Sequence, residues 1–288
     1  MKAPLQFSYE NAMESVVGAD GLLPNELDQT GAIAALDAFR KRVDSGEIGF
    51  PNLPDDRTTV RAVSEFAADM RGEVDDVIVV GIGGSALGAY ALDVALRGPH
   101  PVQVAVGRST PSGRTKSRRP GSAALPRLVV LDNVDPGFIA AALERVNPKR
   151  ALACVIAKSG STAESLSTFM IVREWLGKAL GKRARSRIVA VTDAQKGDLL
   201  TIAKQEQYPL FFVPGNVGGR FSVFTPVGLV PAALIGLDIG KLMSGAADAN
   251  LLAWSRDFDH NQALSSAVVH HALNTRRAKS IEIVYAYS

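Results

Sequence analysis

The sequence predicts an α/β fold in which a parallel sheet is flanked by helices. Short runs rich in Val and Ile have the composition of strands that are buried on both faces. Helical patterns fill most of the gaps between them, and this alternation is typical of a parallel sheet. The runs are residues 77–80, 102–106, 128–131, 152–156 and 188–191.

The remaining elements follow in order along the chain. Apolar residues recur at helical spacing over 31–43, a Ser-Gly pair ends that pattern, and a proline-rich connection follows at 50–54. We therefore expect a helical arm over residues 1–55. The helices expected between and after the strands are residues 85–96, 136–146, 161–176, 196–205, 241–254 and 260–277.

Two further segments complete the predicted organisation. Residues 107–121 are basic, polar and rich in proline, and we interpret them as a solvated surface insertion rather than as a contact for an anionic partner. Residues 281–287 have the pattern of a strand. We expect an α/β domain over 56–238, and over 239–288 linking helices with the first strand of an incomplete second domain.

Composition excludes several classes of protein. The 288 residues are 47% hydrophobic and 21% charged, which is typical of a globular chain and not of a disordered one. A net charge of +3 suits an anionic small molecule but falls short of a nucleic-acid-binding surface, so we expect no nucleic-acid partner. The lone Cys154 lies in an apolar run and is interpreted as a core residue.

The sequence shows no signal for metal binding, membrane insertion or secretion. The four histidines lack metal-ligand spacing, so we expect no metal. The first ten residues lack the apolar region of a signal peptide, and the apolar stretch 224–237 contains two prolines and is too short to span a bilayer. We therefore expect a cytoplasmic protein with no membrane contact.

Two loops at the ends of predicted strands carry the strongest chemical signal. The first, 81–88, reads Gly-Ile-Gly-Gly-Ser-Ala-Leu-Gly; Ala86 breaks the dinucleotide-binding spacing, and a tight turn is the alternative to a ligand site. The second, 157–165, places Ser159, Ser161 and Thr162 at the start of a helix, beside Lys158. Hydroxyls and free N–H groups at a helix N-terminus favour phosphate, with simple helix capping as the alternative.

A third segment contains a projecting arginine. Gly218-Gly219-Arg220 combines a backbone that bends tightly with a guanidinium that can bind an oxyanion. A structural ion pair is the alternative role for Arg220. Because the carboxyl ends of parallel strands meet at one edge of a sheet, we expect the two hydroxyl-bearing loops to converge on one pocket.

Together and in this order, the three segments resemble the phosphoglucose isomerase family, aldose–ketose isomerases of glycolysis and gluconeogenesis. Residues 81–85, 158–162 and 218–222 each resemble a family signature, and Asn133 to Pro136 and Val191 to Asp193 are similar as well. The resemblance implies two sugar-isomerase (SIS-type) domains, a homodimer, a sugar phosphate as substrate, and no cofactor.

By the same resemblance, each loop residue has an expected role. Arg220 is the catalytic residue, which stabilises the charge of a cis-enediolate intermediate. The remaining residues bind substrate, with the phosphate held by Ser159 and Thr162 and the sugar by Gly84 and Ser85. The full substrate-binding set is Gly83, Gly84, Ser85, Lys158, Ser159, Ser161, Thr162 and Gly219.

Two departures from the family pattern affect the expected activity. Ala157 stands where the family usually has serine, and the missing hydroxyl weakens phosphate binding by about 1 kcal/mol or somewhat more. The family's general base, in a Glu-Ser-x-Gly-Lys type motif, and its Gln-His segment and C-terminal lysine do not occur in these residues. Glu164 and Glu282 are the substitutes to consider, and we interpret them as first-turn helix charge and a strand residue.

Three hypotheses remain open on this basis. In the first, the chain is the N-terminal part of a glucose-6-phosphate isomerase, which binds sugar phosphate but is inactive alone. In the second, it is a non-catalytic sugar-phosphate-binding or sensing module; Arg220 favours the first, because a sensor has less need of it. In the third, it is a related isomerase acting on mannose phosphates.

Overall fold

The computed structural model describes residues 7–98, 125–159 and 161–284. The chain divides into two compact units. The larger unit is Ile48–Met243, and the smaller one combines Met1–Glu47 with Ser244–Ser288. Whether the C-terminal helices begin a second sugar-isomerase domain stays a prediction.

The larger unit contains a five-stranded sheet in the order β2-β1-β3-β4-β5, and all its neighbouring strands are parallel. The chain leaves β1 toward β2 on one side and returns to β3 on the other. In sheets of this order, ligands bind beyond the carboxyl ends of the two neighbouring strands whose following connections run in opposite directions, here β1 and β3. The strands are β1 (Asp76–Val80), β2 (Arg127–Leu131), β3 (Ala151–Ala157), β4 (Ile188–Thr192) and β5 (Leu210–Phe212).

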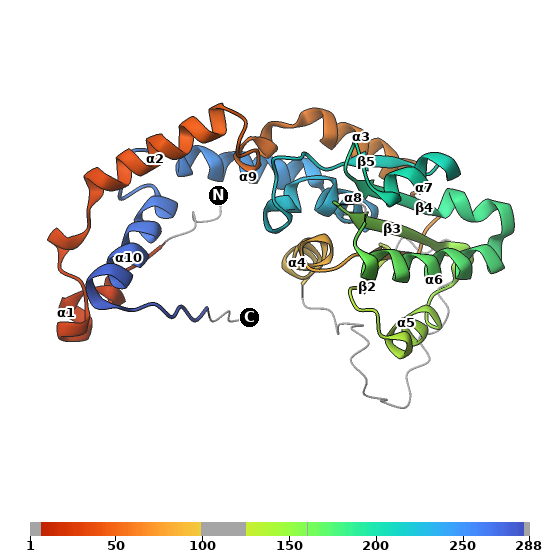
Figure 1. Ribbon diagram of the computed structural model, residues 1–288, viewed down its shortest axis with the longest axis horizontal. Helices are drawn as coiled ribbons and strands as arrows, with labels where there is room; N and C mark the ends of the chain where they lie inside the picture. The colour runs from red at the N-terminus through yellow and green to blue at the C-terminus, as the bar shows by residue number, and fades with distance from the viewer. Residues whose placement is uncertain (1–6, 99–124, 160, 285–288) are drawn as a thin grey trace. The chain divides into compact units, whose positions relative to one another are not determined.

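Helices cover both faces of this sheet (Figure 1). Successive strand residues point to opposite faces, so Ile78 and Val80 pack with α5, α6 and α7, whereas Val77 and Val79 pack with α3, α4 and α8. The helices of this unit are α3 (Arg57–Asp69), α4 (Gly84–Arg97), α5 (Pro136–Leu143), α6 (Ala163–Leu180), α7 (Asp198–Glu206) and α8 (Pro226–Leu234), with 3₁₀ segments η4 (Phe50–Asp55), η5 (Pro148–Arg150), η6 (Gly181–Arg187) and η7 (Gly219–Phe224).

Helix α8 accounts for the most apolar stretch of the sequence. Thr225 caps it by accepting a hydrogen bond from the Val227 N–H at 3.2 Å, and Pro226 occupies the first helical position. Almost every residue of α8 is buried against the sheet, which explains its apolar composition. In the part of the chain that the structure describes, no helix is long and apolar enough to span a membrane.

In the smaller unit, segments from the two ends of the sequence pack together. Ala32 lies in one apolar cluster with Leu264 and Val268, and Arg277 pairs with Glu26 at 2.6 Å. Helix α9 (Ile239–Ala253) begins in the larger unit, where Met243 is buried. The other elements are α1 (Glu14–Val17), α2 (Gln29–Asp44) and α10 (Gln262–Arg277), with η1 (Glu10–Ala12), η2 (Gly18–Asp20) and η3 (Pro24–Glu26).

The predicted fold class is confirmed, since the sheet is parallel and flanked by helices. Cys154 is a core residue of β3, and burial raises the pKa of its thiol. The predicted strand at 281–287 is wrong for 281–284, which pair with no described strand and are largely exposed. Strand β5 and helices α3 and α8 were missed. The predicted strand 102–106 and insertion 107–121 lie outside the described residues.

Candidate active site

The loop after β1 depends on glycine at two positions. Gly83 has a φ of +59°, in the left-handed region that side chains disfavour, and it directly precedes α4. Gly84 lies so close to η7 that a Cβ atom there would overlap the carbonyl group of Gly219. Ser85, partly exposed, is the second residue of α4. The loop after β1 therefore lies directly against the segment that bears Arg220.

The loop after β3 carries three hydroxyl groups at the start of α6. The Ser159 Oγ and Thr162 Oγ1 atoms lie 3.1 Å apart, and the Ser161 N–H donates to Ser159 Oγ at 3.4 Å. Thr162 is the N-cap residue, yet its side chain makes no capping hydrogen bond. The first-turn N–H groups of this 18-residue helix and its dipole add positive potential at the hydroxyls. The arrangement can accept a phosphate; Gly160 lies outside the described residues.

Lys158 connects this loop to the segment before η7. Its Nζ atom donates to the carbonyl oxygens of Val217 at 2.5 Å and Gly215 at 3.2 Å. These two bonds use two of the three ammonium protons. A second bond between strand ends comes from Thr192 Oγ1, which donates to the Ala157 carbonyl at 2.8 Å. The sequence pattern identified Lys158 but not its acceptors, because backbone carbonyls have no residue signature.

Arg220 projects from a turn that is held at several points. Ser222 Oγ donates to the Gly219 carbonyl at 2.7 Å, and the Phe221 ring stacks on Phe50 with a centroid separation of 4.6 Å. The Gly49 N–H donates to the Asn216 carbonyl at 3.0 Å. The Arg220 side chain itself is exposed and, within the described residues, forms no hydrogen bond or ion pair. The structural ion pair considered as its alternative role is therefore not found there.

The carboxylates at this edge of the sheet accept backbone hydrogen bonds. Asp193 accepts from the Gln195 N–H at 2.7 Å and from the Lys196 N–H at 3.2 Å, and these bonds, with the nearby Lys196 and Lys158 charges, lower its pKa. Asp135 accepts from the first turn of α5 as its N-cap. Both carboxylates therefore act as local structural acceptors.

The last residue of β3 differs in environment from the loop that follows. Ala157 is 2% exposed, and its side chain belongs to the core on the side of α5, α6 and α7. Glu164 is exposed in the first turn of α6, as the sequence predicts, and Glu282 lies 3.7 Å from the His270 Nδ1 atom in the smaller unit. How Ala157 affects phosphate binding stays a prediction.

The structure brings the three predicted segments together beyond the carboxyl ends of the strands. Gly84 meets Gly219, Lys158 holds the segment that precedes Arg220, and Ser159 and Thr162 face each other. The convergence follows from the strand order, because β1 and β3 are neighbours that pair Val80 with Val155. That these residues bind substrate remains a proposal.

Comparison with known proteins identifies the family to which this chain is similar. The model of the phosphoglucose isomerase family matches residues 57–288. The chain is 35% identical over 293 residues to a glucose-6-phosphate isomerase of Rubrobacter xylanophilus, covering 99% of this chain and 62% of that protein. With a glucose-6-phosphate isomerase of Carboxydothermus hydrogenoformans it shares 34% identity over 258 residues, which is 88% of this chain and 52% of that one.

Two solved structures share the fold of this chain. A hypothetical protein from Thermus thermophilus superimposes with a TM-score of 0.70 at 32% identity, covering 86% of this chain and 54% of that one. A glucose-6-phosphate isomerase of Chlamydia trachomatis gives a TM-score of 0.62 at 23% identity, over 77% of this chain and 38% of that one, and supports the fold alone. The chain thus spans between half and two thirds of the length of the curated relatives described above. With the family model matching four-fifths of its residues, the chain belongs to the phosphoglucose isomerase family.

Proposed function

We propose that this chain supplies the phosphosugar-binding part of a glucose-6-phosphate isomerase, which interconverts glucose 6-phosphate and fructose 6-phosphate. The observation that carries the proposal is the convergence of three segments beyond the ends of β1 and β3. One segment presents hydroxyls at a helix N-terminus, and another presents the exposed Arg220. The contact between Gly84 and Gly219 joins the first segment to the third.

In this proposal the phosphate binds at the start of α6. The hydroxyls of Ser159 and Thr162 donate to phosphate oxygens, and the unpaired N–H groups of the first helical turn complete the site. Lys158 contributes mainly by position, because its ammonium already donates to two carbonyls. Net binding energy comes from several modest hydrogen bonds to one dianion.

Arg220 would act on the reacting end of the sugar. Isomerisation between the first two carbons passes through an enediolate, and a guanidinium stabilises that negative charge where it develops. The unpaired state of Arg220 among the described residues supports this role, because no carboxylate has to be displaced first. A pure sensor would not require such a group, so the observation favours the isomerase over the sensing module.

Isomerisation also needs a general base to transfer the proton, and the motif that carries this base in the family is missing from the 288 residues. Asp193 is held ionised by two backbone N–H groups, and a lowered pKa makes it a weaker base. No Glu-Ser-x-Gly-Lys motif occurs in the 288 residues. We therefore infer that the 288 residues alone bind the sugar phosphate with negligible turnover.

The test combines binding and turnover on one sample. Thermal-shift titration with glucose 6-phosphate should raise the melting temperature saturably, since a ligand that binds only the folded state at about 100 times Kd stabilises it by about 2.7 kcal/mol. Glucose at equal concentration should not. The double variant Ser159→Ala/Thr162→Ala should lose the shift, whereas Ser167→Ala, an exposed hydroxyl further along α6, should retain it.

The outcomes separate the hypotheses. A coupled assay that detects fructose 6-phosphate formation by the 288 residues would overturn the proposed lack of turnover and direct the search for a base to Glu164 and Glu282. Absence of any shift with glucose 6-phosphate would refute the binding proposal itself. A larger shift with mannose 6-phosphate than with glucose 6-phosphate would favour the mannose-phosphate relative.

A further inference from the structure

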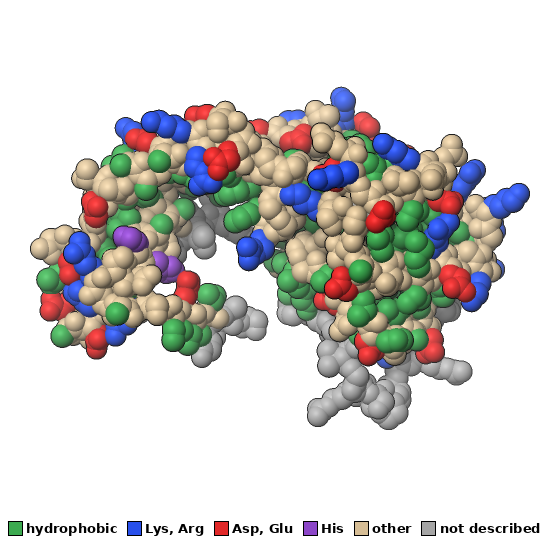
Figure 2. Space-filling view, in the orientation of Figure 1, with side chains coloured by type: hydrophobic (Ala, Val, Ile, Leu, Met, Phe, Trp, Pro, Cys, Tyr) green, Lys and Arg blue, Asp and Glu red, His purple; other side chains and the backbone are tan. Residues whose placement is uncertain are grey.

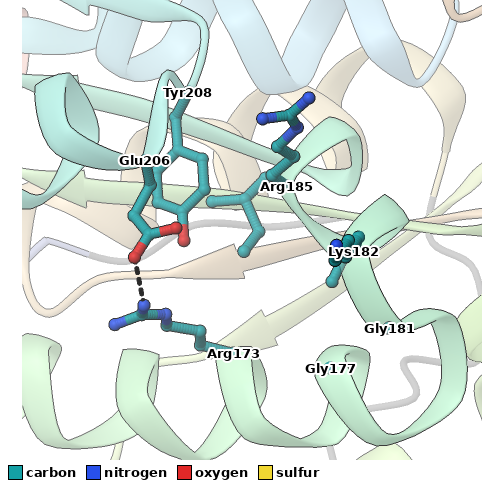
Figure 3. Close-up of a pocket in the computed structure, with 9 residues that line it drawn as sticks. Arg173, Gly177, Gly181, Lys182, Arg185, Glu206 and Tyr208 are labelled. Carbon is teal, nitrogen blue, oxygen red and sulfur yellow. Dashed lines mark hydrogen bonds and ion pairs between the residues drawn. The ribbon is translucent and has the colours of Figure 1, made fainter.

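A pocket lies near the amino end of β4, at the end of the sheet opposite to the loops described above. It is open and encloses about 560 Å³. Ile188, the first residue of β4, lines it, so it lies at the amino end of that strand, whereas the candidate active site lies beyond the carboxyl ends. Figure 3 shows Arg173, from α6, and Arg185, from η6, on opposite sides of it.

The pocket carries an excess of positive charge. Three cationic side chains line it, Arg173, Lys182 and Arg185, against the single carboxylate of Glu206, which leaves a net charge of +2. Glu206 is already committed to Arg173 through a hydrogen bond of 2.5 Å (Figure 3). Figure 2 shows Lys and Arg side chains gathered over the end of α6 and the segment that follows.

The two other cations lack a carboxylate partner. Within the described residues, Lys182 forms no hydrogen bond or ion pair, and Arg185 makes only a long bond of 3.5 Å to the Gln207 amide oxygen. By contrast, Arg187 in the same 3₁₀ segment pairs with Glu73 at 3.2 Å. Lys182 and Arg185 are both exposed, so an anion can reach them without breaking an existing ion pair.

The base of the pocket is closed by buried residues, and its wall is open. Ala184, Ile188 and Tyr208 line the pocket but are almost fully buried, so they present little apolar surface to a ligand. A Cβ atom added at Gly177 or at Gly181 would meet nothing within 4 Å. This combination fits a ligand whose anionic group meets the cations while the rest of it occupies the open space. The lining offers no Ser, Thr or Asn side chain to recognise sugar hydroxyls.

We propose that this pocket is a second ligand site, which binds a small phosphate monoester. Lys182 and Arg185 hold the phosphate dianion, whose charge matches the net charge of the pocket. The site is separate from the phosphosugar loops, and the proposal does not depend on the proposed function.

The test is isothermal titration calorimetry with phenyl phosphate as the probe and inorganic phosphate for comparison. Binding of phenyl phosphate should be saturable, and inorganic phosphate should compete with it, because both present a phosphate anion to Lys182 and Arg185. Lys182→Gln/Arg185→Gln should weaken it by about tenfold, since two solvent-exposed charge contacts are lost. Both residues are exposed, so an unchanged melting temperature will verify that the variant is folded.

Two matched variants make the result specific. Arg183→Gln/Lys204→Gln removes the same charge from exposed positions that do not line the pocket, and it should bind phenyl phosphate as the parent does. Ser159→Ala/Thr162→Ala disables the phosphate loop, and it should also retain binding. Equal weakening in the first control would reveal non-specific attraction, and loss in the second would place the ligand in the phosphosugar loops. Either result, or no saturation up to about 10 mM, would overturn the proposal.

Discussion

Replacing Lys158 with methionine removes an ammonium that bonds two backbone carbonyls while keeping most of the apolar side chain. The acceptors are Val217, at 2.5 Å, and Gly215, at 3.2 Å. Val217 is a buried residue, so its carbonyl loses a partner that water replaces poorly. A hydrogen bond to a charged donor contributes about 1.5–3 kcal/mol when buried, and Lys158 is half-buried, so we expect a loss of about 1–2 kcal/mol in the free energy of unfolding.

Urea denaturation of the parent and the Lys158→Met variant measures this loss, with Lys196→Met as the control. Lys196 carries an exposed ammonium at the same edge of the sheet, and within the described residues its side chain donates to no carbonyl. The control should therefore unfold at nearly the same urea concentration as the parent. A positioning role also predicts that glucose 6-phosphate binds the variant more weakly, because the phosphate loop and the segment before Arg220 are no longer joined. Unchanged denaturation with a large loss of affinity would refute the reasoning and make Lys158 a direct phosphate ligand.

Three further predictions follow from single positions. Gly84→Ala should destabilise the protein by about 1–3 kcal/mol in urea denaturation, because its Cβ would overlap the Gly219 carbonyl, whereas Gly177→Ala, with open space around it, should be neutral or stabilising by up to about 1 kcal/mol. The Asp193 pKa is lowered in the folded state, so its contribution to stability is present above the ordinary value of 3.8 and is lost as pH falls through the folded pKa; Asp193→Asn should flatten this part of the acid denaturation profile, and an unchanged profile would contradict it. Ala157→Ser places a hydroxyl in the core and should cost about 1 kcal/mol of stability in urea denaturation; a gain in phosphate affinity without that cost would show that the hydroxyl reaches the loop.

The sheet was predictable because its three inner strands, β1, β3 and β4, are buried on both faces. All five residues of β1 and all seven of β3 are buried, and this produces the uninterrupted Val- and Ile-rich runs on which the fold class depends. Strand β5 lies at the edge of the sheet and leaves Phe212 exposed. Its three residues are all apolar, but the run is too short to be recognised as a strand. Residues 281–284 show the opposite failure. They include β-branched residues, but a strand also needs a neighbouring strand with which it can form backbone hydrogen bonds. The residue pattern does not show whether such a neighbour exists.

Helix α8 was missed for a different physical reason. Its residues are apolar all round, so the 3.6-residue period that marks a surface helix is absent. Pro226 lies at the first helical position, where it is tolerated, but Pro231 lies inside the helix, where proline usually indicates a break. The buried surroundings override that local preference. No pattern within the stretch itself could have revealed those surroundings.

For the candidate site, residue types were predictable and their connections were not. Glycine, hydroxyl and arginine positions stand out in the sequence, and the parallel sheet places the first two loops at one edge. The contact of Gly84 with Gly219 joins segments 135 residues apart, and only the folded backbone specifies it. Lys158 is the clearer example, because a lysine in a phosphate loop suggests a ligand contact, whereas its observed acceptors are carbonyls.

Arg220 differs from two other arginines of the larger unit in a way that suits it to meet a reacting anion. Arg127 pairs with Asp76 at 2.6 Å, and Arg150 pairs with Asp75 at 2.7 Å, so in both cases a carboxylate already neutralises the guanidinium. Arg220 has no such partner in the described part of the chain, and its turn is fixed by the Ser222 hydrogen bond and the ring stack of Phe221. A guanidinium that no carboxylate neutralises can meet negative charge that develops beside it without first breaking an ion pair. The same turn contacts the loop after β1, and Lys158 bonds the residues just before the turn, so the loops that would bind the substrate also fix the backbone that carries this arginine.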